Sequence, residues 1–143
     1  MQEPNQTIQT RYEALQGYNV FTRWLHSIRY RHILSVIEEF ATCESPRRPV
    51  RILDIGCGPA KLYRILNERF PIEYLGCEIQ AGFIEVARAR HGNQPNFRIT
   101  DQSITSGNIS LHDWDIIVAL ETLEHIPEHY CPVKFCSTMI STR

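Results

Sequence analysis

Residues 50–60 read VRILDIGCGPA, and this stretch decides the fold. Val50–Ile55 is a short apolar run of strand length, of the kind that is buried on both faces of a sheet. Gly56 and Gly58 follow it at once. Helical spacing resumes beyond this glycine loop at Leu62, Ile65 and Leu66. A strand, a glycine turn and a helix in this order form the first part of a βαβ unit, which predicts a parallel sheet.

The alternation continues through the rest of the chain. Further strands are predicted at Glu73–Glu78, Asn96–Thr100 and Trp114–Leu120, with a helix at Ala81–Arg90. Because βαβ crossovers are right-handed, these elements predict an α/β fold with a parallel sheet and helices on both faces. In such a sheet a ligand binds outside the carboxyl ends of the strands.

Composition sets broad limits on partners. The chain has 143 residues, 43% hydrophobic and 22% charged, with a net charge of −1. This is ordinary for a single globular domain and gives no general reason to expect nucleic acid or an anionic membrane. No apolar run approaches the roughly 20 residues needed to span a bilayer. The polar N-terminus lacks a signal-peptide pattern, so we expect a cytoplasmic protein without a membrane partner.

The five cysteines are odd in number and none has C-x-x-C spacing. They are therefore expected to be reduced thiols rather than a disulfide framework or a structural zinc site.

The residues that flank the glycine loop limit the kinds of ligand that it could bind. Glycine permits positive φ and lets a ligand approach the backbone, and the helix that follows offers free N–H groups. A dinucleotide fingerprint would place Gly or Ala at position 61, where this chain has Lys61. Asp54, two residues before Gly56, is the more informative feature.

The sequence D-x-G-C-G at Asp54–Gly58 resembles motif I of the class I (Rossmann-like) S-adenosylmethionine-dependent methyltransferases. The resemblance implies that Gly56, Cys57 and Gly58 pass under the methionine moiety of the cofactor. It also implies that Asp54 supports the loop and the cofactor's amino group. The family's usual glycine at the end of the motif is Ala60 here.

Two further acids follow in register. Glu78 closes the second strand, and a carboxylate can accept hydrogen bonds from two adjacent ribose hydroxyls. The resemblance assigns that role to Glu78, adenine packing to Ile79, and acceptance from the adenine amino group to Asp101, with Gln102 beside it. The alternative is structural: a plain turn at the glycines, and helix N-caps at Glu78 and Asp101.

The segment after the fourth strand carries the candidate chemistry. The resemblance to the class I methyltransferases implies that Leu120 and Glu121 face the cofactor. The sequence ETLEHIPEH at 121–129 resembles the corresponding stretch of the ubiquinone-biosynthesis O-methyltransferases. That resemblance makes Glu124 and His125 the candidate catalytic residues, with His125 as a general base or an orienting group near the acceptor.

Other interpretations of this segment remain open. Glu121, Glu124 and His125 also match the Glu-x-x-Glu-His of small-RNA 3′-terminal 2′-O-methyltransferases, which bind a divalent cation. The further histidine of that family is missing, so no metal site is predicted, and RNA stays an alternative acceptor. The match of 125–129 to H-x-x-E-H is rejected because Pro127 interrupts the helix that a zinc hydrolase needs. A third interpretation is a solvated loop and helix start.

Before the first strand, apolar residues recur at helical spacing from Phe21 to Phe40, and the loop CESPRRP follows at 43–49. We therefore divide the chain into an N-terminal helical cap at 1–48, an S-adenosylmethionine-binding Rossmann-like core at 49–130 and an atypical tail at 131–143. Complete domains of the family have seven strands, yet only 23 residues follow Leu120. The chain is therefore expected to be C-terminally incomplete, without the final strands.

A missing fifth strand would leave the fourth strand at an edge, where another chain could pair with it, so the oligomeric state stays open.

The predicted function is methyl transfer from S-adenosylmethionine to an oxygen or nitrogen of a small molecule. RNA 3′-terminal 2′-O-methylation is one alternative, and a non-catalytic remnant that binds cofactor or a partner is another. The hypothesis for the incomplete chain itself is weak or absent activity.

Overall fold

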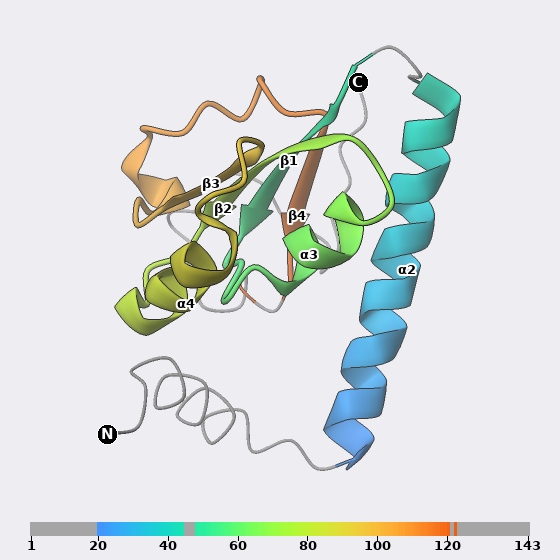
Figure 1. Cartoon of the computed structure of the whole chain (residues 1–143), viewed down its shortest axis with the longest axis horizontal. Helices are drawn as coiled ribbons and strands as arrows, with labels where there is room; N and C mark the ends of the chain where they lie inside the picture. The colour runs from blue at the N-terminus through green and yellow to red at the C-terminus, as the bar shows by residue number, and fades with distance from the viewer. Residues whose placement is uncertain (1–19, 45–47, 121, 123–143) are drawn as a thin grey trace. The chain divides into compact units, whose positions relative to one another are not determined.

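The computed structural model describes residues 20–44, 48–120 and 122 (Figure 1). These residues fall into two compact units, one within 1–46 and one within 47–143, and each is described by itself. The first unit contains α2 (Val20–Glu44), which is one uninterrupted helix. It runs slightly further than the predicted loop start at Cys43. Its buried side chains in the described part are Ile33, Leu34 and Ile37.

The second unit contains a four-stranded sheet in the order β3-β2-β1-β4. All three neighbouring pairs are parallel, which confirms the predicted α/β sheet. The strands are β1 (Val50–Ile55), β2 (Ile72–Cys77), β3 (Phe97–Thr100) and β4 (Ile116–Ala119). The connecting elements are α3 (Lys61–Asn67), α4 (Ala81–His91) and the 3-10 helix η1 (Ile104–Ser106).

One face of the sheet packs against α3 and α4 through aromatic rings. Tyr63 of α3 lies 5.2 Å from Tyr74 of β2 and 4.8 Å from Phe97 of β3, measured between ring centroids. His91 at the end of α4 lies 5.0 Å from Tyr63. The two helices share this face because β1, β2 and β3 follow one another in one direction, and right-handed crossovers then fall on one side.

The segment 101–115, which contains η1, covers the opposite face. The buried side chains there are Leu53, Ile55, Cys77 and Ala119. Ile104, Ile109 and Trp114 pack against them from the segment. The chain takes this side because the connection from β3 must return across β2 and β1 to reach β4.

The predicted strand limits differ most at β4. It begins at Ile116 rather than at Trp114, because the Trp114 side chain packs on the sheet and Asp115 is held by arginines. Within the described residues β4 is the outermost strand on its side. The prediction that the final strands are missing concerns the part of the chain after β4, most of which lies outside the described residues, and it stays a prediction. None of the described helices is long and apolar enough to cross a membrane.

A carboxylate joins the beginnings of β1 and β4. Asp115 accepts hydrogen bonds from Arg48 Nη1 and Nη2 at 2.6 and 2.8 Å and from the backbone N–H of Arg51 at 2.9 Å. The Asp115 backbone N–H in turn donates to the Arg51 carbonyl at 3.0 Å. The hydrogen bonds from Arg48, reinforced by that of Arg51, lower the pKa of Asp115 from 3.8 to about 2.

Replacing Asp115 by Asn is expected to lower the free energy of unfolding at pH 7 by about 1–2 kcal/mol, since both arginines are partly exposed and screened. A carboxyl whose pKa is depressed by folding stabilises above its unfolded pKa and loses that effect as pH falls. The gap between wild type and Asp115→Asn should therefore stay constant from pH 7 to about 5, shrink as pH falls through 4 and nearly close at about pH 2.

Urea unfolding across this pH range measures the gap. Asp113→Asn is the matched control, because that neighbouring acid is exposed. A pH-independent gap, or one no larger than that of the control, would contradict the role of Asp115.

Candidate functional site at the carboxyl edge of the sheet

The glycine loop after β1 alternates left-handed residues. Gly56, Gly58 and Ala60 have φ of 70°, 54° and 57°. The backbone N–H groups of Gly56 and Cys57 donate to the Cys77 carbonyl at 2.8 and 3.2 Å, which fastens the loop to the end of β2. The positive φ at Ala60 gives a physical reason for the glycine that the family places there.

Glu78 is the acid that organises this edge. It lies directly after β2 and is 7% exposed. Its Oε2 accepts the Gly58 N–H at 2.9 Å, and its Oε1 accepts the N–H groups of Ile79 and Gln80, both at 2.8 Å. The N-cap of α4 is Gln80, which forms no side-chain cap. Glu78 therefore supports the turn into α4 and also reaches across to the glycine loop.

Asp54, near the end of β1, is 3% exposed and lies on the α3 and α4 face of the sheet. Its Oδ2 accepts a hydrogen bond of 2.5 Å from the Tyr74 hydroxyl. Burial raises the pKa of Asp54 from 3.8 to about 7, the Tyr74 hydrogen bond lowers it, and the nearby Glu78 charge raises it. A carboxyl that titrates near neutral pH is the kind of group found in functional sites.

The remaining predicted contacts lie at the same edge. Ile79 is 74% exposed, which is unusual for a large apolar side chain beside a buried acid. Asp101 and Gln102 follow β3 and are exposed. The Gln102 N–H donates to Thr100 Oγ1 at 3.2 Å. The sheet thus brings Gly56, Gly58, Glu78, Ile79, Asp101 and Gln102 to the carboxyl ends of three adjacent strands.

The Cys57 side chain points away from this edge. It is buried, and a methyl group placed on Gly76 would lie only 2.5 Å from its Sγ, so Gly76 makes room for it. Burial raises the pKa of the Cys57 thiol and raises that of Cys77 to about 12. Both thiols are free and behave as small buried apolar groups. Any contact of Cys57 with a ligand would come from its backbone.

The end of β4 is described up to Leu120 and again at Thr122. The Thr122 hydroxyl lies 3.1 Å from the Ile55 carbonyl and 2.9 Å from that of Leu120, and can donate to either. Its side chain fills the space where a methyl group on Gly56 would sit. The predicted residues Glu121, Glu124 and His125 lie outside the described residues.

Two residues of this site were missed by the sequence analysis. Tyr74 contacts Asp54, and Thr122 closes the space above Gly56. A signal for Tyr74 existed in the strand register. Asp54 pairs with Gly76, so the alternation of a strand places Tyr74 on the same face as Asp54. Thr122 had no comparable signal.

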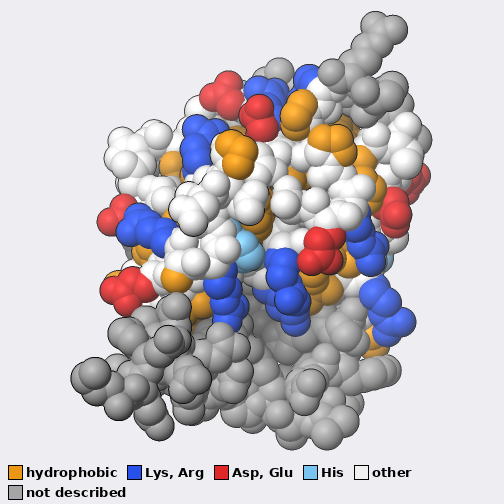
Figure 2. Space-filling view, in the orientation of Figure 1, with side chains coloured by type: hydrophobic (Ala, Val, Ile, Leu, Met, Phe, Trp, Pro, Cys, Tyr) orange, Lys and Arg blue, Asp and Glu red, His pale blue; other side chains and the backbone are white. Residues whose placement is uncertain are grey.

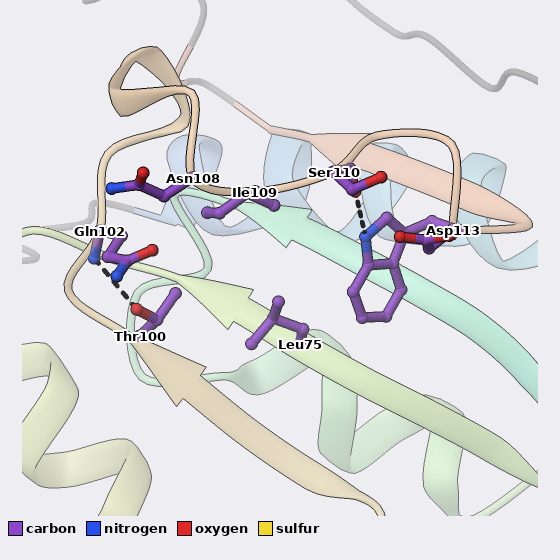
Figure 3. A pocket seen from close by; sticks show the side chains of 8 residues that line it. Leu75, Thr100, Gln102, Asn108, Ile109, Ser110 and Asp113 are labelled. Atoms are coloured by element: carbon purple, nitrogen blue, oxygen red, sulfur yellow. Dashed lines mark hydrogen bonds between the residues drawn. The ribbon is translucent and has the colours of Figure 1, made fainter.

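A shallow depression lies on the other face of the sheet, beneath the segment 101–115 (Figure 3). Its apolar lining residues are Leu75, Ile109 and Trp114, and its polar ones include Gln102 and Asp113. The indole N–H of Trp114 donates to the Ser110 carbonyl at 2.9 Å. The depression shares Thr100 and Gln102 with the carboxyl edge and contains none of the glycine loop.

Within the part of the chain that the structure describes, no three His, Cys, Asp or Glu side chains gather closely enough to hold a metal ion. The described edge of the sheet offers glycine backbone, two buried carboxyls and an exposed apolar side chain.

Comparisons with known sequences agree with this geometry. The methyltransferase domain family matches residues 52–139. A trans-aconitate 2-methyltransferase of Mycolicibacterium gilvum (strain PYR-GCK) is 34% identical over 85 residues, which cover 58% of this chain and 31% of that protein. A ubiquinone biosynthesis O-methyltransferase of Alkalilimnicola ehrlichii is 27% identical over 107 residues, which cover 73% of this chain and 42% of that protein. The chain thus spans less than half the length of these curated relatives.

Solved structures support the fold. Magnesium protoporphyrin IX methyltransferase from Synechocystis PCC 6803, solved with bound S-adenosylmethionine, aligns with a TM-score of 0.61 at 18% identity over 88% of this chain and 62% of that one. The YcgJ protein from Bacillus subtilis aligns with a TM-score of 0.53 at 22% identity, over 69% of this chain and 42% of that one. Because the family match takes in residues 52–139, more than half of the chain, this protein belongs to the methyltransferase domain family.

Proposed function

We propose that the carboxyl edge of the sheet binds S-adenosylmethionine and that the protein transfers its methyl group to an oxygen or nitrogen atom of a small molecule. Membership of the methyltransferase family supports this cofactor. The observation that carries the proposal is the hydrogen bond from the Gly58 N–H of the glycine loop to Glu78. Next to this bond, the described side chains leave open space.

The open space lies at Gly58. Apart from its neighbours in the chain, a methyl group placed on Gly58 would meet no atom of the described residues within 4 Å. Yet Gly58 sits in the middle of the tightly bonded turn between β1 and α3. Glycine with free space around it in an ordered turn fits close approach of a ligand to the backbone.

The residues present fit the parts of this cofactor. A carboxylate has about four lone-pair sites, and the three backbone donors on Glu78 leave capacity for a ribose hydroxyl. Ile79 would cover one face of the adenine, and Asp101 with Gln102 would contact its edge. Gly56 and Gly58 would lie along the methionine part, and Asp54 would receive its ammonium group. Leu120 would line the space near the sulfonium.

Once bound, the cofactor supplies a methyl group activated on its sulfonium. The protein's own contribution would be to hold the two reactants in line and to keep water away. Glu124 and His125 remain the proposed acceptor-side residues on the strength of their sequence pattern, and Glu121 before them remains a proposed cofactor contact.

A small-molecule acceptor is favoured over RNA by two observations. The relatives described above carry the names of small-molecule methyltransferases. Figure 2 shows Lys and Arg interspersed with Asp and Glu among the described side chains of the face in view, which offers a polyanion no continuous basic track there.

Calorimetry with S-adenosylhomocysteine, NAD and ATP tests the cofactor assignment. We expect the wild-type chain to bind S-adenosylhomocysteine alone. Glu78→Gln should lose about tenfold to a hundredfold in affinity, because the charge-assisted hydrogen bond to a ribose hydroxyl would be lost. Glu73→Gln on the same strand is the matched control, since Glu73 is exposed and away from the edge.

Because Glu78 also supports the backbone, Asp101→Asn gives a second test at an exposed position, and it should weaken binding without loss of stability. Equal affinity of all variants, or binding of NAD rather than S-adenosylhomocysteine, would rule out the proposed site.

The two glycines separate folding from binding. Gly56→Ala combines positive φ with a clash between the added methyl group and the Thr122 side chain, so it should destabilise the chain by about 2 kcal/mol or more. Gly58→Ala has only the φ penalty of about 1 kcal/mol. We expect Gly58→Ala to remain folded in urea titrations and to lose affinity for S-adenosylhomocysteine. Undiminished affinity of folded Gly58→Ala would show that no ligand lies against this glycine.

A further inference from the structure

We propose that Tyr74 is a positioning residue for the cofactor site, whose hydroxyl holds Asp54 in the orientation and charge state that receive the ammonium group of the cofactor. The inference rests on the proposed function and assigns a new role within that same site. It starts from the 2.5 Å contact between the Tyr74 hydroxyl and Asp54 Oδ2, deep beneath the glycine loop.

The tyrosine ring is fixed by its surroundings. Tyr74 is 1% exposed, and its ring stacks on Phe97 at 5.8 Å with an interplanar angle of 13°. The ring of Tyr63, on α3, lies 5.2 Å from the Tyr74 ring, measured between centroids. A ring held on two sides cannot swing its hydroxyl away at low cost. The hydroxyl is therefore a preset donor aimed at Asp54.

The other groups near Asp54 do not favour its charge. On β2 and just beyond it, Glu78 repels the carboxylate, and Cys77 is an uncharged thiol. Cys57 of the glycine loop is likewise an uncharged thiol. β4 carries no titratable side chain along Ile116–Ala119, and the charged residues of α3, Lys61 and Arg64, are exposed.

The hydrogen bond from Tyr74 thus opposes the effect of burial on the pKa of Asp54. Burial raises the pKa of Asp54 to about 7, and the Tyr74 hydroxyl is the group that lowers it. An ammonium group pairs with the ionised form of Asp54, so cofactor affinity should fall as pH drops below about 7. Without the hydroxyl the pKa of Asp54 would rise further, and the loss of affinity would begin at a higher pH.

The test is the affinity for S-adenosylhomocysteine from pH 5.5 to 8.5, measured by calorimetry on wild type, Tyr74→Phe and Tyr63→Phe. Tyr63→Phe is the matched control, because it removes a buried hydroxyl from the same cluster that bonds to Asn96 at 2.9 Å instead of to Asp54. The titration of the ligand's own amino group is common to all three proteins and cancels in the comparison.

We expect the midpoint of the pH profile to move up by about one pH unit in Tyr74→Phe and to stay in place in Tyr63→Phe. At pH 7 this corresponds to an affinity loss of about tenfold at most. An unchanged profile would overturn the proposal, and so would a loss of affinity that is equal at every pH, since that would be a purely structural effect.

Failure of the wild-type chain to bind S-adenosylhomocysteine at any pH would instead refute the proposed function itself. If Tyr74→Phe does not fold, proton NMR of the wild-type complex decides the matter. A slowly exchanging Tyr74 hydroxyl proton in the complex is expected, and its loss on addition of S-adenosylhomocysteine would overturn the proposal.

Discussion

The carboxylate of Glu78 ties together the end of β2, the turn into α4 and the glycine loop after β1. It accepts one N–H from Gly58 and two from the residues that follow it. Each of these donors would otherwise be an unsatisfied backbone group near the sheet edge. Glu78 therefore stabilises the glycine loop at Gly58, together with the hydrogen bonds from Gly56 and Cys57 to the Cys77 carbonyl. The order of the site depends on a residue that also belongs to the fold.

The sheet core and the site are coupled through small residues. Gly76 stands opposite Asp54 in the β1–β2 pairing and leaves room for the Cys57 side chain. Gly56 leaves room for Thr122, which approaches from beyond β4. A side chain at either glycine would displace a neighbour that shapes the loop. The shape of the glycine loop thus depends on the packing of side chains beneath it. Asp54 is buried among these side chains, near the carboxyl end of β1.

Much of this arrangement could be predicted from the sequence. Val50–Ile55 forms a strand with the predicted limits, and the order of strands and helices follows the alternation of apolar periods. The places of Glu78 and Asp101 directly after their strands were predicted from the spacing of the sequence motifs. Tyr74 was not identified because a tyrosine in a strand is ordinarily a core residue, and only its partner Asp54 gives it a role. The start of β4 was misjudged because periodicity cannot show that Asp115 is held by Arg48.

The proposed cofactor site lies at the carboxyl edge of β1, β2 and β3. Amide NMR of the uniformly ¹⁵N-labelled chain, titrated with S-adenosylhomocysteine, tests this most directly. We expect the largest shift changes at Gly56, Gly58, Ile79 and Asp101. We expect small changes at Ile109 and Ser110, which line the depression on the other face. Changes concentrated at that depression, or none in a folded sample, would contradict it.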